Sequence, residues 1–199
     1  MTGISVMQCK LALAEAEGDK NKAVEILKKI SGDIALKKAA RDTKDGAVMI
    51  KNDDKKSVLV SLRCETDFVS RNEDFISLLK NLTKIAFSEG LDKMLEKAKE
   101  LIDPIIQKTG EKIELGENYL VEGKILGNYV HNDKKGGIVS LEEGTPELAR
   151  EIAMHLVAMQ PENIDTLLDQ PFIKNPSETV GQLLQKAKAR IKEIRSYSI

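Results

Sequence analysis

The first 32 residues carry apolar side chains at the spacing of two short helices. Val6 to Ala16 is rich in good helix formers, and Ser5 begins a capping box. Gly18 ends this helix, Asp19 is placed to cap a second one, and Ser31-Gly32 end the second. Two helices of this length bury too little apolar surface to fold by themselves. We therefore expect them to lack a partner helix or to lean on the rest of the chain.

The stretch 33–46 is typical of a basic, partly helical linker. It has few large apolar groups and four basic side chains: Lys37, Lys38, Arg41 and Lys44. The chain therefore divides into an N-terminal helical module (1–32), this linker (33–46) and a core (47–199).

After Gly46 the apolar period changes to that of a strand. Apolar and polar side chains alternate from 57 to 64, which predicts a half-buried strand. The polar cluster 52–56 predicts a hairpin turn back to a first strand over 47–51.

Two or three helices are expected after this hairpin. Apolar residues recur at helical spacing from Phe75 until Gly90, and a further helix follows from 91 to about 101. Asp103-Pro104 is typical of a cap with proline in the first turn. It predicts a separate short helix that ends at Gly110.

A second group of strands is expected within 112–142. The pattern predicts one strand from Tyr119 to His131, a polar turn, and another strand from 137 to 141. Thr145-Pro146 then opens a helix that Pro161 closes.

The end of the chain is less well defined. Ser177 is expected to start a last helix, and the tail 191–199 fits a helix or a strand. Because strands and helices come in blocks, the order favours an α+β fold, with an antiparallel sheet and helices in the core.

Composition narrows the classes of function. Of the 199 residues 41% are hydrophobic and 32% charged, and 31 basic against 32 acidic side chains give a formal net charge of −1. This near-zero charge argues against a nucleic-acid binder that neutralises phosphates. No apolar run reaches the roughly 18–20 residues of a membrane span, and no signal pattern opens the chain. We expect a cytosolic protein that binds neither nucleic acid nor membrane.

Side chains suited to catalysis are few. The sequence lacks a glycine-rich phosphate loop, a dinucleotide fingerprint, a zinc-protease helix and a nucleophile elbow, so we expect no enzyme, cofactor or metal. Cys9 and Cys64 have neither metal nor redox spacing and are expected to be small buried residues. His155 lies among apolar neighbours and is expected to pack. His131 precedes a turn and is either a surface bystander or a partner contact.

The segment 63–72 is the most unusual of the chain. A strand ends there, and Glu65, Thr66, Asp67 and Phe68 precede the next helix. One interpretation is an ordinary loop, in which Thr66 or Asp67 caps the helix and Phe68 packs in the core. The other is a protruding tip, in which an apolar side chain beside a carboxylate wedges into another protein. A carboxylate placed beside a bound metal or phosphate there would weaken that ligand.

Four stretches of the chain match one known family, in that family's order. They are Thr2-Gly3 to Gly18-Asp19, Cys64 to Val69, Tyr129-Val130-His131 with Gly137-Ile138-Val139, and Ala153 to Pro161 with Gln170 to Leu184. Together they span most of the chain and resemble translation elongation factor Ts.

The resemblance implies a small ubiquitin-associated-like N-terminal module, a linker and an α+β core that together grip elongation factor Tu. By carry-over, Asp67 and Phe68 would insert near the magnesium and phosphate end of that partner's guanine-nucleotide site, flanked by Thr66 and Val69. The other implied contacts are Met7 in the N-terminal module, Lys37 or Lys38 in the linker, and Thr109, Gly110 and His131 in the core.

The implied function is guanine-nucleotide exchange: binding of elongation factor Tu and faster GDP release, in the cytoplasm or in an organelle matrix. The alternative is a scaffold relative that holds elongation factor Tu, or another translation protein, without exchange. Three departures indicate a shortened form of the family. The first helix before Thr2 is missing, a long helical hairpin between Pro161 and Gln170 is absent, and the usual ending after Ile191 is not recognisable. The sequence does not determine the oligomeric state.

Overall fold

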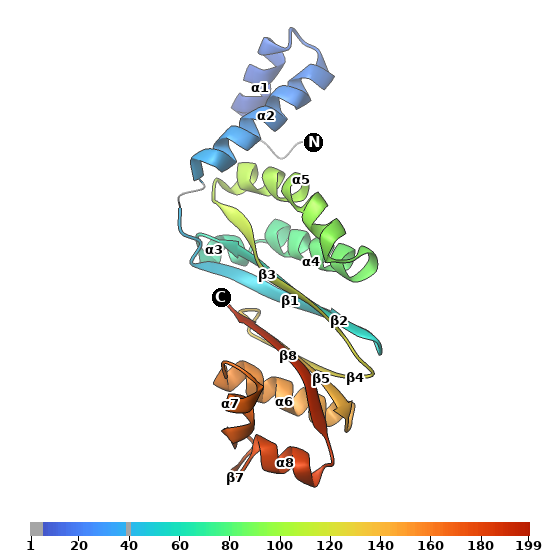
Figure 1. The fold of residues 1–199 in the computed structure, drawn as a ribbon. Helices are drawn as coiled ribbons and strands as arrows, with labels where there is room; N and C mark the ends of the chain where they lie inside the picture. Colours follow the sequence, from blue (N-terminus) through green and yellow to red (C-terminus); the bar gives the residue numbers. More distant parts are fainter. Residues whose placement is uncertain (1–5, 39–40) are drawn as a thin grey trace.

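The structure, a computed structural model, describes residues 6–38 and 41–199, and for residues 31–38 it describes the backbone alone. Figure 1 shows layers stacked in one direction: the N-terminal helical hairpin, a pair of long helices, two three-stranded sheets and a last group of helices. Neighbouring strands in the described sheets run antiparallel. The predicted α+β class is confirmed.

The core is built of two halves that follow the same order. The N-terminal hairpin contains α1 (Val6–Glu15) and α2 (Lys20–Lys38). The first half contains β1 (Asp45–Asn52), β2 (Lys56–Cys64), α3 (Asp67–Ser70), α4 (Glu73–Glu89), α5 (Leu91–Thr109) and β3 (Ile113–Glu122). The second half contains β4 (Ile125–His131), β5 (Lys135–Glu143), α6 (Pro146–Met159), α7 (Ile164–Asp169), β6 (Pro171–Phe172), β7 (Asn175–Thr179), α8 (Val180–Lys186) and β8 (Arg190–Ser198). Each half is thus a hairpin, then helices, then a strand that returns to the hairpin.

In the first half, α4 and α5 cover one face of the sheet of order β1-β2-β3. Alternate residues of β2 point toward the helices because successive side chains of a strand lie on opposite faces. The buried cluster includes Val58, Val60, Leu62 and Cys64 from β2 and Phe75, Leu79, Leu82 and Met94 from the helices. The predicted hairpin turn is confirmed by the pairing of Asn52 with Ser57, and the helix end at Gly90 is also confirmed.

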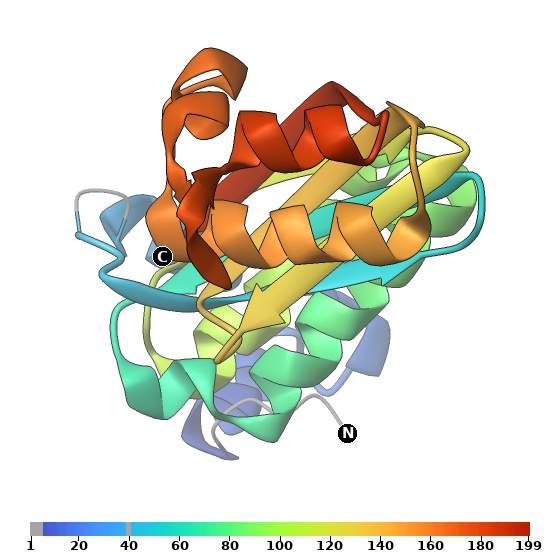
Figure 2. The same ribbon diagram turned by 90° about the horizontal axis from the view of Figure 1, so that it is seen from below.

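In the second half, α6 and α8 lie over the outer face of the sheet of order β4-β5-β8, as Figure 2 shows from below. The side chain of Thr145 accepts a hydrogen bond from the Leu148 N–H (3.2 Å) and caps α6 as predicted. Strand β4 approaches the α6 backbone closely at Gly127. A Cβ there would lie 2.0 Å from the carbonyl carbon of Ala149, so only glycine allows this contact.

His155 is fully buried between α6 and the β6–β7 hairpin. Its Nδ1 accepts a hydrogen bond from the Ile173 N–H (3.2 Å), and its Nε2 lies 3.0 Å from Oε1 of Gln170. Burial lowers the pKa of His155, and the bond to Gln170 opposes this only in part. The neutral ring is therefore part of the packing, as predicted.

The two sheets pack face to face across a small apolar layer. It contains Val48, Leu59, Val121 and Ile138, with Ile50, Tyr119, Leu126, Tyr197 and Ile199 at its margin. Both sheets therefore have two covered faces, one against helices and one against each other.

The N-terminal hairpin packs against α5. Its own cluster consists mainly of small residues: Ala12, Ala16, Ala23 and Leu27. Oδ1 of Asp19 accepts from the N–H groups of Asn21 (2.8 Å) and Lys22 (3.2 Å), so the predicted cap of α2 is confirmed. Gln107 of α5 donates a hydrogen bond to the Leu27 carbonyl (3.2 Å). The predicted cap at Ser5 lies outside the described residues.

Two predicted helix ends are wrong. Helix α2 continues through Ser31-Gly32 to Lys38, because the cost of one glycine, about 1 kcal/mol, is less than the gain from the helix formers that follow. Helix α5 also runs unbroken past Pro104. Its buried residues Met94, Ala98, Ile102 and Ile106 recur every four positions on both sides of the proline. Packing of that stripe outweighs the hydrogen bond that proline cannot donate. The division into three domains stays a prediction.

Three further expectations change in the second half of the chain. The single strand predicted from Tyr119 to His131 is two strands, β3 and β4, which belong to different sheets. The alternation of apolar and polar residues continues across Gly123, where the chain passes from one sheet to the other. The pattern therefore could not show that the strand divides there. The last helix begins after Thr179, which forms a capping box with Gln182, and not at Ser177. The tail, left open by the sequence, is strand β8.

We expect Gly127→Ala to lower the free energy of unfolding by about 3 kcal/mol, because the added methyl group meets the α6 backbone, which cannot move alone. Asn128→Ala, the next residue on the opposite face of β4, is the control, with an expected change of about 0.5 kcal/mol. Urea denaturation measures both. Equal stability of the two variants would show that β4 and α6 separate easily.

We expect His155 to make stability depend on pH. Its native pKa is lowered, so the unfolded chain binds more protons, and stability falls as the pH drops below the ordinary value of 6.5. The difference in unfolding free energy between wild type and His155→Gln should therefore shrink from pH 7 to pH 5 in urea titrations. A constant difference would contradict this expectation.

Candidate functional site

The segment after β2 forms an exposed tip. Thr66 occupies the N-cap position of α3 in an extended conformation, and α3 itself is a single turn. Phe68 is 85% exposed, whereas the next residue, Val69, is 8% exposed and packs in the first core cluster. The interpretation that Phe68 packs in the core is therefore wrong, and Val69 anchors the turn in its place.

A carboxylate lies next to this exposed ring. Oδ2 of Asp67 forms an ion pair with Nη2 of Arg71, one turn further along (3.4 Å); the side chain of Arg71 is 77% exposed and that of Asp67 is 46% exposed. An exposed pair of this kind contributes little to stability. Asp67 is thus accessible to a partner, together with Phe68.

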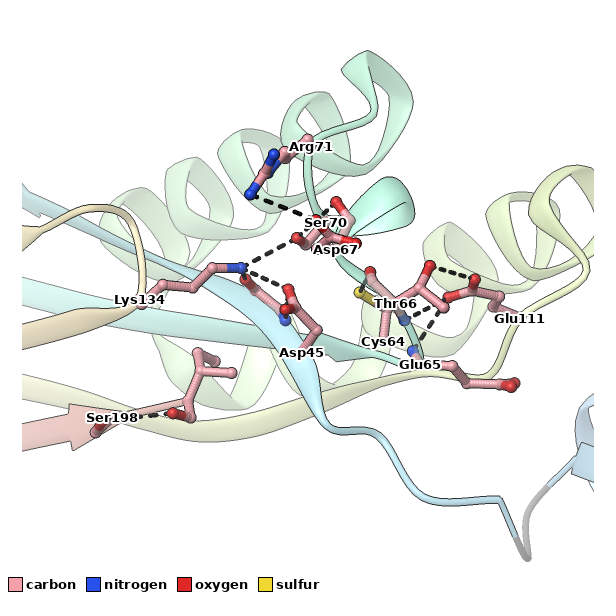
Figure 3. Close-up of polar contacts among 12 residues, drawn as sticks. Asp45, Cys64, Glu65, Thr66, Asp67, Ser70, Arg71, Glu111, Lys134 and Ser198 are labelled. Carbon is pink, nitrogen blue, oxygen red and sulfur yellow. Dashed lines mark hydrogen bonds and ion pairs between the residues drawn. The ribbon is translucent and has the colours of Figure 1, made fainter.

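Glu111 braces the tip from the loop between α5 and β3 (Figure 3). Its Oε2 accepts from the backbone N–H groups of Glu65 (3.1 Å) and Thr66 (3.0 Å), and its Oε1 accepts from the Thr66 hydroxyl (2.6 Å). The Thr66 hydroxyl therefore does not cap α3. Gly110 has φ of +78° and ends α5, which turns the chain so that Glu111 meets the tip. The predicted residues Thr109 and Gly110 are thus brought next to Thr66.

Cys64 lies fully buried beneath the tip. Its Sγ lies 3.2 Å from the carbonyl oxygen of Thr66. Burial is the main cause that raises the pKa of the Cys64 thiol to about 12, and the negative charges of Asp45 and Glu111 contribute to this rise. The thiol is a packing group, as predicted, whereas Cys9 is only half-buried.

Lys134 connects the tip with the β4–β5 turn (Figure 3). Its Nζ donates to Oδ1 of Asp45 (2.5 Å), to the Gly46 carbonyl (2.6 Å) and to the Ser70 hydroxyl (3.1 Å). Burial raises the pKa of Asp45, but hydrogen bonds, first that from Lys134, outweigh this effect and lower the pKa overall. The carboxylate and the ammonium group are therefore held as an ion pair.

His131 lies at the exposed end of β4. Its Nδ1 lies 3.3 Å from the Tyr129 hydroxyl, and its Nε2 lies 3.3 Å from Nδ2 of Asn132. Three residues further on, Lys134 contacts Ser70, the last residue of α3. The turn that carries His131 therefore lies against the tip.

The remaining predicted contacts lie on the N-terminal hairpin. Met7 is 67% exposed on α1, in the outermost helical layer of Figure 1. Lys37 and Lys38 belong to the last turn of α2, but their side chains lie outside the described part of the chain. The structure thus gathers Thr66 to Val69, Thr109-Gly110 and the His131 turn, and places Met7 on a separate element.

The sequence analysis missed two residues that hold this site, Glu111 and Lys134. Glu111 directly follows Thr109-Gly110, and a carboxylate after a helix-ending glycine is a weak signal. Lys134 stands among other charged residues of a surface turn. No periodicity marks either residue, because their partners are 45 or more positions away in sequence.

In residues 6–38 and 41–199, no helix is long and apolar enough to cross a membrane.

Comparison with known proteins gives a consistent result. Residues 65–166 match the family model described as Elongation factor TS. The Elongation factor Ts of Marinobacter nauticus is 33% identical over 240 residues, covering 94% of this chain and 82% of that protein. The Elongation factor Ts of Hahella chejuensis is 32% identical over 250 residues, covering 100% and 87%, and that of Cellvibrio japonicus is 32% identical over 243 residues, covering 96% and 84%.

The aligned region of the Hahella protein is longer than the 199 residues of this chain, so that relative has additional residues inside it. This agrees with the expected absence of an internal insertion, and the two departures expected at the ends of the chain stay predictions. The matched region begins at the tip itself, at Glu65, and ends beyond α6. By these matches, the chain belongs to the elongation factor Ts family of translation elongation factors.

Proposed function

We propose that this protein binds elongation factor Tu and accelerates the release of GDP from it. The observation that carries the proposal is the 85% exposure of Phe68 on a braced turn, beside the accessible carboxylate of Asp67. An exposed phenylalanine contributes nothing to the core of its own chain. Burying it in a partner is favourable by about 1.5–3 kcal/mol, which makes it suited to act as a wedge.

The proposed mechanism is displacement by linkage. Phe68 enters a site near the magnesium and phosphate end of the nucleotide pocket, and Asp67 brings negative charge toward the phosphates. Like charges repel each other more strongly as water is excluded, so this arrangement weakens the binding of GDP. Linkage is reciprocal: the factor weakens the binding of GDP, and GDP weakens the binding of the factor. Each ~1.4 kcal/mol of unfavourable coupling between factor and nucleotide lowers the affinity for GDP tenfold.

No covalent step is required by this mechanism. The protein would lower the barrier to dissociation, bind the nucleotide-free partner, and be displaced when GTP binds. We therefore propose a non-enzymatic factor without a cofactor of its own, which acts in the cytoplasm, or in an organelle matrix if its source is an organelle. His131 and Thr109-Gly110, which flank the tip, would supply further contact area, and Met7 would add a contact from α1.

A scaffold function is the second candidate. The additional residues in the aligned region of the Hahella relative favour it: a shorter chain offers less surface to a partner, and a smaller interface binds more weakly. A scaffold would bind elongation factor Tu and leave the rate of GDP release unchanged.

We expect Phe68→Ala to lower the stimulated rate of labelled-GDP release from elongation factor Tu about tenfold or more, since the buried ring is lost. The melting temperature should stay the same, because Phe68 does not pack in the core. Leu95→Ala is the matched control: Leu95 is 52% exposed on α5, away from the tip, and its loss should leave the rate unchanged.

Other outcomes would decide against the proposal. If wild type releases GDP no faster than buffer, exchange is excluded, and co-precipitation of elongation factor Tu would then favour the scaffold. If Phe68→Ala lowers the melting temperature strongly, the ring packs in the core.

We expect Glu111→Ala to lower the stimulated rate of GDP release several-fold, although the variant keeps both Asp67 and Phe68. The change removes three hydrogen bonds that fix Glu65 and Thr66, at a cost of about 1–2 kcal/mol in stability. Hydrogen exchange of the Glu65 and Thr66 amides should become faster. Glu111→Gln keeps the shape and one acceptor oxygen and should give an intermediate rate. An unchanged rate of GDP release with Glu111→Ala would show that the function of the tip does not depend on Glu111.

A further inference from the structure

We propose that Lys134 is a positioning residue, which locks the tip and the His131 turn into one rigid unit so that both meet the same partner together. This inference rests on the proposed function, since it concerns how the exchange surface is held. Lys134 itself is not assigned a contact with the partner.

The geometry of the ammonium group supports this role. A lysine ammonium has three N–H donors and no acceptor. In Lys134 all three have an acceptor: Oδ1 of Asp45 at 2.5 Å, the Gly46 carbonyl at 2.6 Å and the Ser70 hydroxyl at 3.1 Å. The first two acceptors belong to the start of β1 and the third to the end of α3 (Figure 3). One side chain from the second half of the core therefore joins two elements of the first half.

The backbone of the turn is fixed independently of this side chain. The Val48 N–H donates to the Asp133 carbonyl (2.7 Å), and the Ile199 N–H donates to the Lys134 carbonyl (3.0 Å). The turn is thus anchored to β1 and to the end of β8 whether or not the ammonium group is present. What the ammonium group adds is the bond to Ser70, and so a link from this anchored turn to the tip.

The tip is consequently held from two sides. Glu111 holds its first residues from the α5–β3 loop, and Lys134 holds its last residue through Ser70. Phe68 lies between these two points. A single helical turn cannot hold its shape by its own hydrogen bonds, because nucleating a helix is unfavourable. Contacts at both ends of α3 fix the direction in which Phe68 projects.

Lys134 and its three acceptors on Asp45, Gly46 and Ser70 form a clamp, and the geometry of this clamp requires lysine. Arginine presents its donors in a flat fork suited to carboxylates, and this fork does not match three acceptors grouped around one nitrogen. Lys134 and Asp45 are both half-buried, so the ion pair is partly screened from solvent. Lys135, the next residue and the first of β5, carries the same charge beside this turn and provides a matched comparison.

The experiment compares Lys134→Met, Ser70→Ala and Lys135→Met for release of labelled GDP from elongation factor Tu. We expect Lys134→Met to lower the maximal rate at saturating factor about fivefold, with a change of less than about twofold in the half-saturating concentration. Ser70→Ala leaves the bonds from Lys134 to Asp45 and Gly46, removes the bond from Lys134 to the tip together with the bond of the Ser70 hydroxyl to the Asp67 carbonyl (3.2 Å), and should reproduce most of this loss. Lys135→Met should match wild type, since its charge is not part of the clamp.

A double-mutant cycle separates positioning from general destabilisation. If Lys134 acts through the tip, Lys134→Met should cause little further loss in a Phe68→Ala background, so the two effects are non-additive. Full additivity, or equal losses in Lys134→Met and Lys135→Met, would overturn the proposal and indicate instead an effect on stability or on charge attraction.

Amide hydrogen exchange tests the clamp without elongation factor Tu. The N–H groups of Ser70, Arg71 and Asn72 close the turn of α3 by bonding to Thr66, Asp67 and Val69. In Lys134→Met these amides should exchange faster than in wild type, and in Lys135→Met they should not. If wild type does not accelerate GDP release but the amides still exchange faster in Lys134→Met, only the proposed function is refuted. Active wild type, with Lys134→Met unchanged in both rate and amide exchange, would refute only the clamp.

Discussion

The face-to-face contact between the two sheets determines how the rest of the molecule is arranged. Val48 and Leu59 of the first sheet meet Ile138 of the second in a thin apolar layer. Gly136 lies so close that a Cβ would come within 2.7 Å of Cγ1 of Val48. This close approach sets the start of β5, and hence the turn before it, directly against β1. The tip belongs to the first half and His131 to the second, so their proximity depends on this contact.

The two halves share one order of elements but treat the junction between strand and helix differently. In the second half, Thr145 caps α6 through the Leu148 N–H, and a long helix follows at once. In the first half, Thr66 occupies the same place, but its hydroxyl bonds to Glu111. Here α3 is one isolated turn, and α4 begins separately at Glu73 with Asn72 as its cap. Phe68 projects from this isolated turn and is 85% exposed.

An exposed phenylalanine gains nothing from folding, so its position must be fixed by its neighbours. Val69 anchors the turn in the apolar core, and Glu111 and Lys134 hold its two ends by charged hydrogen bonds. Such bonds are directional, and they are stronger than bonds between neutral groups. Apolar anchoring thus supplies the stability of the tip, while the charged groups define its orientation. An element that must enter a partner protein needs both.

The sequence by itself determined the features that depend on near neighbours. Alternation predicted β2, the polar cluster predicted the first hairpin turn, and Asp19, Thr145 and Gly90 marked helix ends correctly. Four stretches in the family's order, among them Cys64 to Val69, also identified the family. Only the tertiary structure decided that Phe68 projects, that α5 continues past Pro104, and that the stretch from Tyr119 to His131 divides between two sheets. It alone revealed Glu111 and Lys134. The physical reason is the same in each case: these outcomes depend on packing and hydrogen bonds between residues far apart in the chain, which leave no period in the sequence.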